Sequence, residues 1–326
     1  MPTLITGGAG YIGSHMVLDL LATGEPVIVL DDLSTGFARL VPPNVTLIRG
    51  DIGDTGLVGT IIKSHAIDAV LHFAAKIVVP DSMTDPLGYY LNNTSKARNL
   101  IEAAVNGGVK DFIFSSTAAV YGEARDMPVS EETPASPVSP YGRSKLMVEW
   151  MLQDAIRAYG LNAMILRYFN VAGADPEGRT GQSTPRATHL IKTASEAATG
   201  KRDGMSVFGT DYPTPDGTCI RDYIHVSDLA RAHRLALHYM RAGGQGTVLN
   251  CAYGHGYSVM DVIKTVKRVS GIDFPVTFTE RRAGDPPEIV ATGAKLRTLL
   301  GWVPAYDDLE TIVAHALAWE RHEAAM

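Results

Sequence analysis

The sequence has few cysteines and no long apolar run. Cys219 and Cys251 are the only two cysteines among 326 residues, which is too few for the disulfide framework of a small secreted protein. We therefore expect a reducing, cytoplasmic compartment. No stretch reaches the ~18 apolar residues that a membrane helix needs. The N-terminus shows no basic segment ahead of an apolar one, so we expect no secretion signal.

Positive charge is also in short supply. The chain has 29 Lys and Arg against 35 Asp and Glu, which gives a formal net charge of -6. This balance disfavours nucleic acid or an anionic membrane as a general partner. A hydrophobic fraction of 45% and a charged fraction of 20% are ordinary for a globular protein, which excludes disorder, collagen and coiled coil. The histidines lack the H-x-x-x-H spacing of a metal site, so we expect no metal.

Short apolar runs alternate with helical patterns through the first half of the chain. The near-continuous apolar character of these runs is typical of parallel strands covered on both faces. Asp85-Pro86 and Ser139-Pro140 each predict an N-cap followed by proline at the first helical position, with helices that end near Gly107 and Tyr159. Strands are predicted at residues 3–6, 27–30, 45–48, 69–73, 112–115 and 163–169. This alternation predicts an α/β fold with a doubly wound, Rossmann-like parallel sheet.

The pattern changes after Asn170. Proline, glycine and aspartate become frequent over residues 173–185 and 209–217, while helical patterns persist at 189–199, 228–241 and 258–270. We predict a large domain over residues 1–170, to which about 219–241 return. Residues 171–218 and 242–326 would form a smaller α/β lobe that binds substrate.

A glycine-rich loop follows the first predicted strand. Residues 7–13 read GGAGYIG and open the first helix. Glycine lets the backbone turn sharply and approach a pyrophosphate, and the helix N-terminus attracts its negative charge. Asp31 and Asp32 follow the second strand about 20 residues on, where an acid binds the ribose 2′-hydroxyl and repels the phosphate of NADP. The loop therefore predicts an NAD site, although a glycine triplet alone would also fit an ordinary strand–helix turn.

Tyr141 and Lys145 lie four residues apart at the start of a predicted helix, so they share one face. A free phenol has a pKa of about 10 and is a poor base at neutral pH, but a nearby cation lowers that pKa. The spacing alone is more typical of a surface pair. A catalytic role for the pair is favoured by the hydroxyls of residues 115–117 at the end of a predicted strand, because open α/β sheets bind ligands at the carboxyl ends of their strands.

Several stretches together resemble one family. They are residues 7–15, 31–33, 50–52, 72–75, 112–122, 139–148, 166–170, 208–212, 221–226 and 281–285. On these residues the chain resembles the extended short-chain dehydrogenase/reductase family and, within it, the UDP-sugar 4-epimerase branch. The resemblance runs almost end to end, and its later stretches are specific to that branch. It implies reversible, NAD-dependent 4-epimerisation of UDP-galactose and UDP-glucose through a transient 4-keto sugar.

The resemblance also implies a role for each matching position. Tyr141 would be the catalytic base, Lys145 its electrostatic partner and a ligand of the nicotinamide ribose, and Thr117 the hydroxyl near the sugar O4. Besides Tyr141 and Lys145, the cofactor positions are Gly7, Gly10, Tyr11, Ile12, Gly13, Asp31, Asp32, Leu33, Asp51, Ile52, Phe73, Ala74, Ala75, Asn92 and Tyr168. Besides Thr117, the substrate positions are Asn170, Leu190, Phe208, Arg221, Tyr223, Arg282 and Asp285. Members usually form homodimers through the helices near 86–107 and 140–159, so a homodimer is expected.

Some positions depart from the family pattern. A lysine that many members hold against the cofactor corresponds to Ile77, with Lys76 one residue earlier, and we leave Lys76 unassigned. His189 stands where relatives have an asparagine near the uracil; it either hydrogen-bonds the nucleotide or is a solvated or capping histidine. A large aromatic residue that excludes N-acetyl groups from the sugar pocket is replaced by Ile289.

Three classes of function remain open: a 4-epimerase, a nucleotide-sugar dehydratase or decarboxylase on the same fold, and an NAD-binding protein without catalysis. Dehydratase relatives carry acidic residues directly after Thr117, whereas Ala118 and Ala119 stand here and cannot transfer protons. The two cysteines show no activating partner and resemble small core residues, which disfavours a four-electron sugar dehydrogenase. The intact set of Thr117, Tyr141 and Lys145 disfavours a scaffold. The sugar could be a hexose, an N-acetylhexosamine or a pentose.

Overall fold

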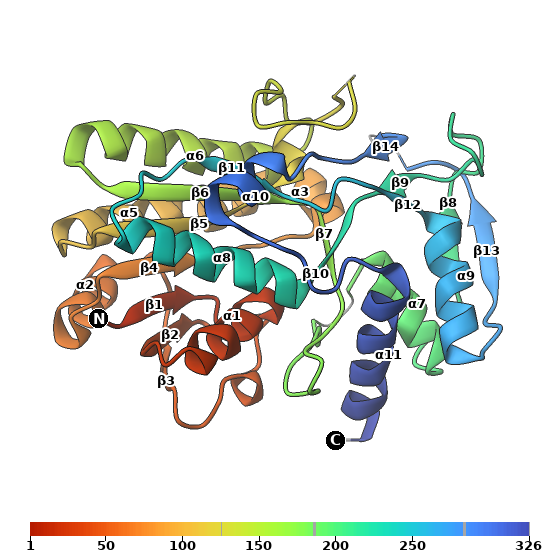
Figure 1. Ribbon diagram of the computed structural model, residues 1–326, viewed down its shortest axis with the longest axis horizontal. Helices are drawn as coiled ribbons and strands as arrows, with labels where there is room; N and C mark the ends of the chain where they lie inside the picture. Colours follow the sequence, from red (N-terminus) through yellow and green to blue (C-terminus); the bar gives the residue numbers. More distant parts are fainter. Residues whose placement is uncertain (125, 185–186, 283–284, 326) are drawn as a thin grey trace.

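Within residues 1–124, 126–184, 187–282 and 285–325, which the computed structural model describes, seven parallel strands form the central sheet (Figure 1). Their order is β11-β6-β5-β4-β1-β2-β3. The strands are β1 (Thr3–Thr6), β2 (Val27–Asp31), β3 (Thr46–Arg49), β4 (Ala69–His72), β5 (Asp111–Thr117), β6 (Asn162–Tyr168) and β11 (Val248–Cys251). The chain order reverses beside β1, which places a ligand crevice at the carboxyl ends of β1 and β4. The predicted doubly wound α/β fold is confirmed.

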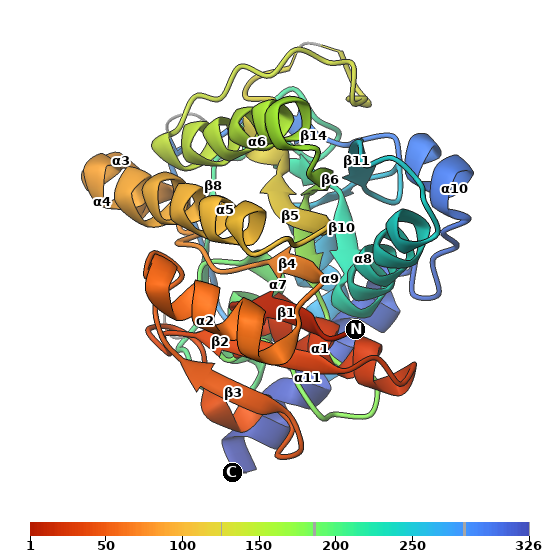
Figure 2. The same cartoon turned by 90° about the vertical axis from the view of Figure 1, so that its left-hand side faces the viewer.

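Helices cover both faces of this sheet (Figure 2). α1 (Tyr11–Ala22) and α8 (Val226–Arg241) lie on one face, and α2 (Thr55–His65), α5 (Lys96–Asn106) and α6 (Pro140–Tyr159) lie on the other. Successive strand residues point to opposite faces, so Leu4 joins the cluster under α2 and α5 while Ile5 joins the cluster under α1 and α8. The strands β1, β2, β4 and β5 are therefore buried at every position.

The segment before β5 differs from its prediction. A single helix was expected from Pro86 to Gly107, but the structure has α4 (Pro86–Tyr89), a π-helical segment η2 (Tyr90–Ser95) and α5. The Asp85 side chain caps the start as predicted, accepting from the Gly88 N–H. A π segment holds more residues per turn and rotates the face of the helix. Leu87 and Leu91, in the part of this segment before α5, are 79% and 59% exposed.

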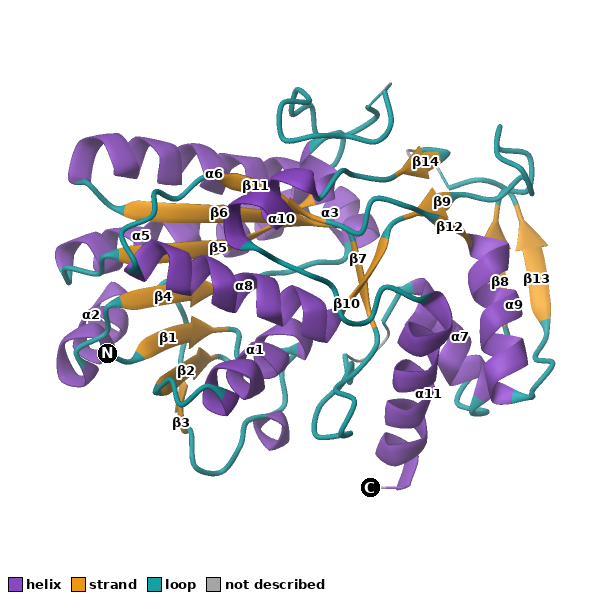
Figure 3. Cartoon of the chain, viewed as in Figure 1, coloured by secondary structure: helices purple, strands orange, loops and turns teal. Residues whose placement is uncertain are grey.

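A smaller lobe packs against the carboxyl-terminal end of the sheet (Figure 3). Its helices are α7 (Leu190–Ala198), α9 (Val259–Ser270) and α11 (Leu309–Ala325). Its strands are β7 (Asn170–Ala172), β8 (Met205–Phe208), β9 (Ile220–Arg221), β10 (Tyr223–His225), β12 (Tyr257–Ser258), β13 (Val276–Thr279) and β14 (Glu288–Ile289). They form three small sheets, β10-β7, β12-β9-β14 and β13-β8. Shorter elements are η1 (Ala38–Leu40), α3 (Val79–Thr84), η3 (Ala118–Val120) and α10 (Ala294–Leu300).

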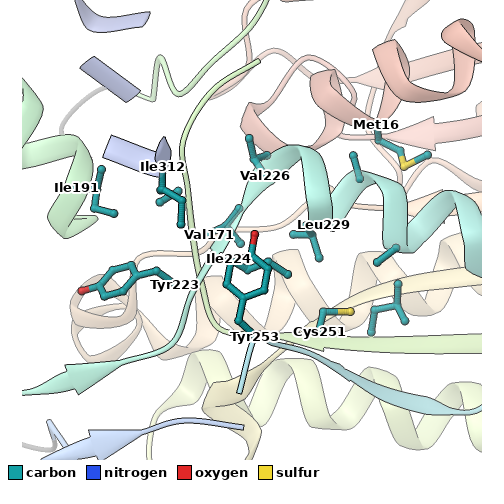
Figure 4. Packing of buried hydrophobic residues seen from close by; sticks show 14 of the residues in the cluster. Met16, Val171, Ile191, Tyr223, Ile224, Val226, Leu229, Cys251, Tyr253 and Ile312 are labelled. Atoms are coloured by element: carbon teal, nitrogen blue, oxygen red, sulfur yellow. The ribbon is translucent and has the colours of Figure 1, made fainter. Parts of the chain in front are cut away.

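One hydrophobic core joins the lobe to the main sheet. In Figure 4 the labelled side chains run from Ile191 and Ile312 in the lobe, past Val171 and Ile224 on the β7–β10 pair, to Leu229 on α8. All five belong to the same buried cluster. The lobe is therefore held rigidly over the carboxyl ends of the strands.

The predicted lobe boundary at residue 242 does not coincide with the sheet. β11 lies beyond that boundary, yet it pairs in parallel with β6, with Val248 opposite Ile165. The four-residue strand contains the buried polar residue Asn250, so it lacked the apolar run on which strand predictions rest. We propose that the NAD-binding domain includes β11, and that the second lobe segment begins after it.

Candidate active site

The loop after β1 forms a cradle that only glycine can build. Gly7 has φ +73°, and a Cβ there would lie 2.6 Å from the Ala74 backbone nitrogen. A Cβ on Gly13 would lie 2.1 Å from the Gly7 carbonyl oxygen. Gly10 precedes α1 without a side-chain cap, so the N–H groups of the first helical turn, which begins with Tyr11 and Ile12, face outward for an anion. These residues fit the pyrophosphate of a dinucleotide.

Asp31 ends β2 and is tied to this cradle. The backbone N–H groups of Ala9 and Leu33 donate to its two carboxylate oxygens, each at 2.9 Å. Burial raises the pKa of Asp31, although these two hydrogen bonds oppose the shift. Asp32 is exposed and accepts from Ser34 within its own turn. Asp31 is therefore the better placed of the two for the adenosine ribose.

A second acidic residue stands beyond β3. Asp51 accepts hydrogen bonds from the Lys96 ammonium and from the Gly53 N–H, which is 2.8 Å away. Burial alone would raise the pKa of Asp51, but these donors hold it below its usual value. The neighbouring Ile52 is buried. A fixed carboxylate beside an apolar side chain suits the adenine edge that the resemblance assigned to them.

Residues 73–76 form the wall opposite the glycine loop. Phe73 packs against the His233 ring, with centroids 4.9 Å apart. The Lys76 ammonium lies 3.6 Å from the Asp85 carboxylate. Ala74 and Ala75 lie between them along the chain, with Ala74 against Gly7. Small side chains here leave the cradle open at the carboxyl end of β4.

Asn93 fixes this wall, and sequence reasoning did not single it out. Its amide oxygen accepts from the Lys76 N–H at 2.8 Å, and its amide nitrogen donates to the Lys76 carbonyl and to Ser144 on α6. The predicted cofactor residue Asn92 donates to the Asn93 oxygen at 3.1 Å. Asn93 lies four residues before the buried Ala97, so helical spacing places it on the inner face. A polar residue at a buried position of the helix was the signal that could have identified it.

Tyr141, Lys145 and Thr117 converge where β5 ends beside α6. Ser139 caps this helix by accepting from the Gly142 N–H at 3.1 Å, so Tyr141 and Lys145 lie on its first turns. The Lys145 ammonium donates to the Ser115 carbonyl at 2.9 Å. Thr117 is the last residue of β5; its hydroxyl accepts from the Ala119 N–H at 3.1 Å and lies near enough to the Tyr141 phenol to influence its pKa. All three side chains are buried.

The electrostatics of this group differ from the sequence expectation. Burial raises the pKa of Tyr141, and the nearby Thr117 hydroxyl opposes the shift only in part. Burial lowers the pKa of Lys145 to about 7, against the attraction of Glu149. The predicted lowering of the Tyr141 pKa by Lys145 is therefore not met. The ammonium bonds to the Ser115 carbonyl instead, and desolvation outweighs the cation.

Two further predicted cofactor residues, both tyrosines, have phenol hydroxyls that hydrogen-bond other groups of the protein. The Tyr168 hydroxyl contacts the Ser115 hydroxyl, and Tyr168 lies opposite Thr117 in the β5–β6 register. The Tyr11 hydroxyl donates to the Gly173 carbonyl at 2.7 Å and so links α1 to the segment after β7. Any contact of Tyr11 with a pyrophosphate must therefore come from its backbone N–H.

The lobe carries two arginines among the predicted substrate residues, and each contacts another predicted residue. On β9, Arg221 lies 3.9 Å from the Asp285 carboxylate. The Arg282 guanidinium stacks over the Phe208 ring, 3.6 Å from its centroid. Each of these two guanidinium groups is thus held by a neighbouring side chain, which suits bidentate phosphate recognition.

A small cavity lies behind these residues. Asn170 and Tyr223, opposite each other in the β7–β10 pair, line it together with His189 and Leu190. His189 makes no side-chain cap for α7, so the capping alternative is wrong. Its Nδ1 lies 2.8 Å from the Gln182 amide nitrogen, and burial lowers its pKa. His189 is therefore a neutral acceptor toward Gln182, with its other ring nitrogen able to donate.

The part of the chain that the structure describes contains no cluster of three or more His, Cys, Asp or Glu side chains arranged for a metal ion. Among the same residues, no helix combines the length and apolarity needed to cross a membrane. Cys219 and Cys251 are buried free thiols, and burial raises the pKa of Cys251.

Comparison with known proteins identifies the family. The model of the NAD dependent epimerase/dehydratase family matches residues 3–252. The chain belongs to this family. It is 55% identical over 318 residues to a UDP-glucose 4-epimerase from Azospirillum brasilense, covering 98% of this chain and 91% of that protein. NAD is therefore its cofactor.

Solved structures extend the likeness within the NAD dependent epimerase/dehydratase family. A UDP-glucose 4-epimerase from Brucella ovis in complex with NAD superposes with a TM-score of 0.95 at 42% identity, covering 97% of both chains. A UDP-Glc/GlcNAc 4-epimerase from Campylobacter jejuni superposes with a TM-score of 0.86 at 48% identity, covering 98% of this chain and 99% of that one. Both are similar over essentially their entire length.

Proposed function

We propose that this protein is an isomerase that interconverts UDP-galactose and UDP-glucose by reversible, NAD-dependent epimerisation at C4. The observation that carries the proposal is the convergence of Tyr141, Lys145 and Thr117 at the end of β5, next to the glycine cradle. Ala118 and Ala119, in the 3-10 turn η3 that follows, supply no acid for elimination. The near full-length similarity to UDP-glucose 4-epimerases supports the same reaction.

The reaction needs a base at O4 and a hydride exchange at C4. NAD, held by the glycine cradle and Asp31, supplies the hydride acceptor and the positive charge of its oxidised ring when bound. The Tyr141 phenolate takes the O4 proton and becomes the neutral phenol, and Thr117 donates to or accepts from the same oxygen. Lys145 places a positive charge beside the phenolate, which favours the charged form.

The substrate must be held firmly by its UDP and loosely by its sugar. Arg221 and Arg282 supply the guanidinium groups for the diphosphate, and Asn170, Leu190, Phe208 and Tyr223 surround the nucleotide side of the opening. A 4-keto sugar held only by this diphosphate can turn over and present its opposite face. Return of the hydride to that face gives the epimer, and the cofactor ends each cycle in its starting state.

The test is to incubate the purified protein with UDP-galactose and no added cofactor. We expect UDP-glucose to form until the two sugars reach equilibrium, without net accumulation of NADH. Stoichiometric NADH, or a dehydrated 4-keto product, would move the protein to another class of the same family.

A sugar range broader than plain hexoses is expected. Ile289 on β14 lies opposite Arg221 in the register with β9, so it borders the diphosphate end of the sugar pocket. An apolar wall of this size discriminates by only about 1–3 kcal/mol, or roughly 10–200-fold in kcat/KM. UDP-N-acetylgalactosamine should therefore be turned over, and Ile289→Tyr should lower its kcat/KM more than that of UDP-galactose. If the wild type does not turn over UDP-N-acetylgalactosamine and Ile289→Ala does, then the isoleucine already closes the pocket to the N-acetyl group.

A homodimer is also expected, because one face of the large domain carries apolar side chains in the open. Leu87, Leu91 and Met83 project from the α3–α4–η2 segment, and Trp150 projects from α6, which packs beside it. Exposed apolar patches of this kind mark association surfaces, and a two-fold contact would cover both copies at once. We propose that this face forms the dimer.

The dimer is tested by light scattering after size exclusion. The wild type should have twice the mass of one chain, and Leu87→Glu should shift it toward the monomer. Ile272→Glu, at an exposed apolar position far along the lobe, should leave the mass unchanged. A wild type that remains a monomer at high concentration would contradict the proposal. We further propose a cytoplasmic location, which the two buried free thiols support.

A further inference from the structure

Directly behind the reacting residues lies a buried ion pair. Glu149 is fully buried on α6, and Arg167, on β6, is 6% exposed. The arginine donates two hydrogen bonds to the carboxylate: Nε lies 3.0 Å from Oε1, and Nη2 contacts Oε2. Desolvation cancels most of the Coulomb attraction of such pairs, so they add little net stability compared with apolar side chains. A role other than stability is therefore worth seeking.

The pair fastens the end of β5 to α6. The Ser116 hydroxyl donates to the same Glu149 oxygen as Arg167 Nε, and Ser116 is paired with Arg167 in the β5–β6 register. Ser115, whose carbonyl accepts from Lys145, and Thr117, beside Tyr141, flank Ser116 in sequence. One carboxylate on α6 thus fixes the strand end that holds the partners of both reacting side chains.

Other contacts hold the arginine in place. Its guanidinium lies 4.9 Å from the centroid of the Tyr121 ring. The Tyr121 hydroxyl donates to the Asn250 amide oxygen at 2.6 Å, so the chain of contacts continues to β11. Both oxygens of the Glu149 carboxylate therefore have hydrogen-bond partners in the interior.

Glu149 is also four residues from Lys145, on the same face of α6. Its negative charge opposes the desolvation that lowers the pKa of Lys145. The ionisable groups facing Lys145 or Glu149 are Tyr141 on α6, His72 on β4, Tyr168 and Arg167 on β6, and Tyr121 after η3. His72 has a pKa of about 3 and stays neutral. Glu149 is thus the group that supports the Lys145 cation.

We propose that Glu149, oriented by Arg167, is a positioning residue: it locks the Ser115–Thr117 strand end against α6 and keeps Lys145 charged beside Tyr141. The proposal rests on the proposed epimerase function. It assigns no contact with substrate or cofactor to either residue.

Glu149→Gln tests the charge while keeping the size of the side chain. Lys145 should lose its proton at lower pH, so the phenolate loses its cation. The alkaline limb of the kcat–pH profile should move down by about two pH units, the effect of one charge at the roughly 6 Å spacing of i,i+4 neighbours with an effective dielectric of about 20. At neutral pH, kcat should fall about 10–100-fold because the strand end also loosens, while KM for UDP-galactose changes little.

The double variant Glu149→Gln with Arg167→Met separates this role from folding. Glu149→Gln alone leaves a buried, unpaired arginine and should lower Tm, whereas removing both charges should restore Tm. The alkaline limb should stay shifted in the double variant. Glu310→Gln, which breaks an exposed ion pair with Arg268, should match the wild type in every measurement.

Two outcomes would overturn the inference. One is a Glu149→Gln variant whose kcat falls equally at every pH, which indicates a purely structural role. The other is a double variant that regains both the Tm and the pH profile of the wild type. Either result is distinct from failure of the proposed function, in which the wild type itself would not convert UDP-galactose.

Discussion

Tyr141→Phe should lower kcat for UDP-galactose by about 10²–10⁴-fold, the usual cost of losing a general base. Phenylalanine keeps the ring and its packing beside Thr117 but removes the only group assigned to take the O4 proton. The measurement is kcat from about pH 6 to about pH 10, a range that approaches the raised pKa of Tyr141. Adding Thr117→Ala should slow the reaction further if the threonine relays the proton when the phenol is missing.

The phenol hydroxyl makes no contact with the glycine cradle, so the same variant should keep its NAD content and fold. NAD content is measured after denaturing the purified protein, and folding is followed by thermal melting. A Tyr141→Phe enzyme with near wild-type kcat at every pH would show that another group removes the proton. A variant that loses both its NAD and its activity would instead show that the main role of Tyr141 is to bind the cofactor.

Gly13→Ala should empty the cofactor site. The added methyl carbon would lie 2.1 Å from the Gly7 carbonyl oxygen and 2.8 Å from the Gly8 Cα. These are backbone atoms, so the loop and the first turn of α1 must move apart. Overpacking of this kind typically costs about 1–3 kcal/mol, and the cradle that faces the pyrophosphate is lost with it. Purified Gly13→Ala should therefore contain little NAD and show no detectable epimerisation.

Gly59→Ala is the matched control. Gly59 lies within α2, and a Cβ there meets no atom within 4 Å. Alanine should raise helix stability by up to about 1 kcal/mol and leave NAD content and kcat unchanged. A Gly13→Ala protein that carries a full complement of NAD would refute the assignment of the cradle.

The fold followed from the sequence where burial imposes a simple period. The six predicted strands are buried on both faces or lie beside those that are, and their apolar runs reveal them. β11 was not predicted because Asn250 interrupts it. The groups that hydrogen-bond Asn250 across the fold, on Tyr121, Val129 and Glu131, are all distant in the sequence. The π segment was not predicted for a related reason. Its extra residue follows from packing against α6 rather than from a local pattern.

The site was predictable where the spacing of residues indicates a function, as at residues 7–13 and at Tyr141 and Lys145. The charged pair behind these residues was not predictable. Glu149 and Arg167 are charged residues that usually lie at the surface, and nothing local shows that they pair across α6 and β6. The Tyr141 pKa was misjudged because the sequence reveals a neighbouring cation but not the desolvation that opposes it.

The most direct measurement follows the C4 hydrogen itself. UDP-galactose carrying deuterium at C4 is mixed with a second UDP-galactose that carries ¹³C throughout its sugar, and the UDP-glucose is analysed by mass and NMR. Oxidation and reduction at one carbon in one closed pocket predict that every deuterium remains at C4 of the ¹²C molecule from which it came. Deuterium lost to water, moved to another carbon or found in the ¹³C sugar would contradict that mechanism.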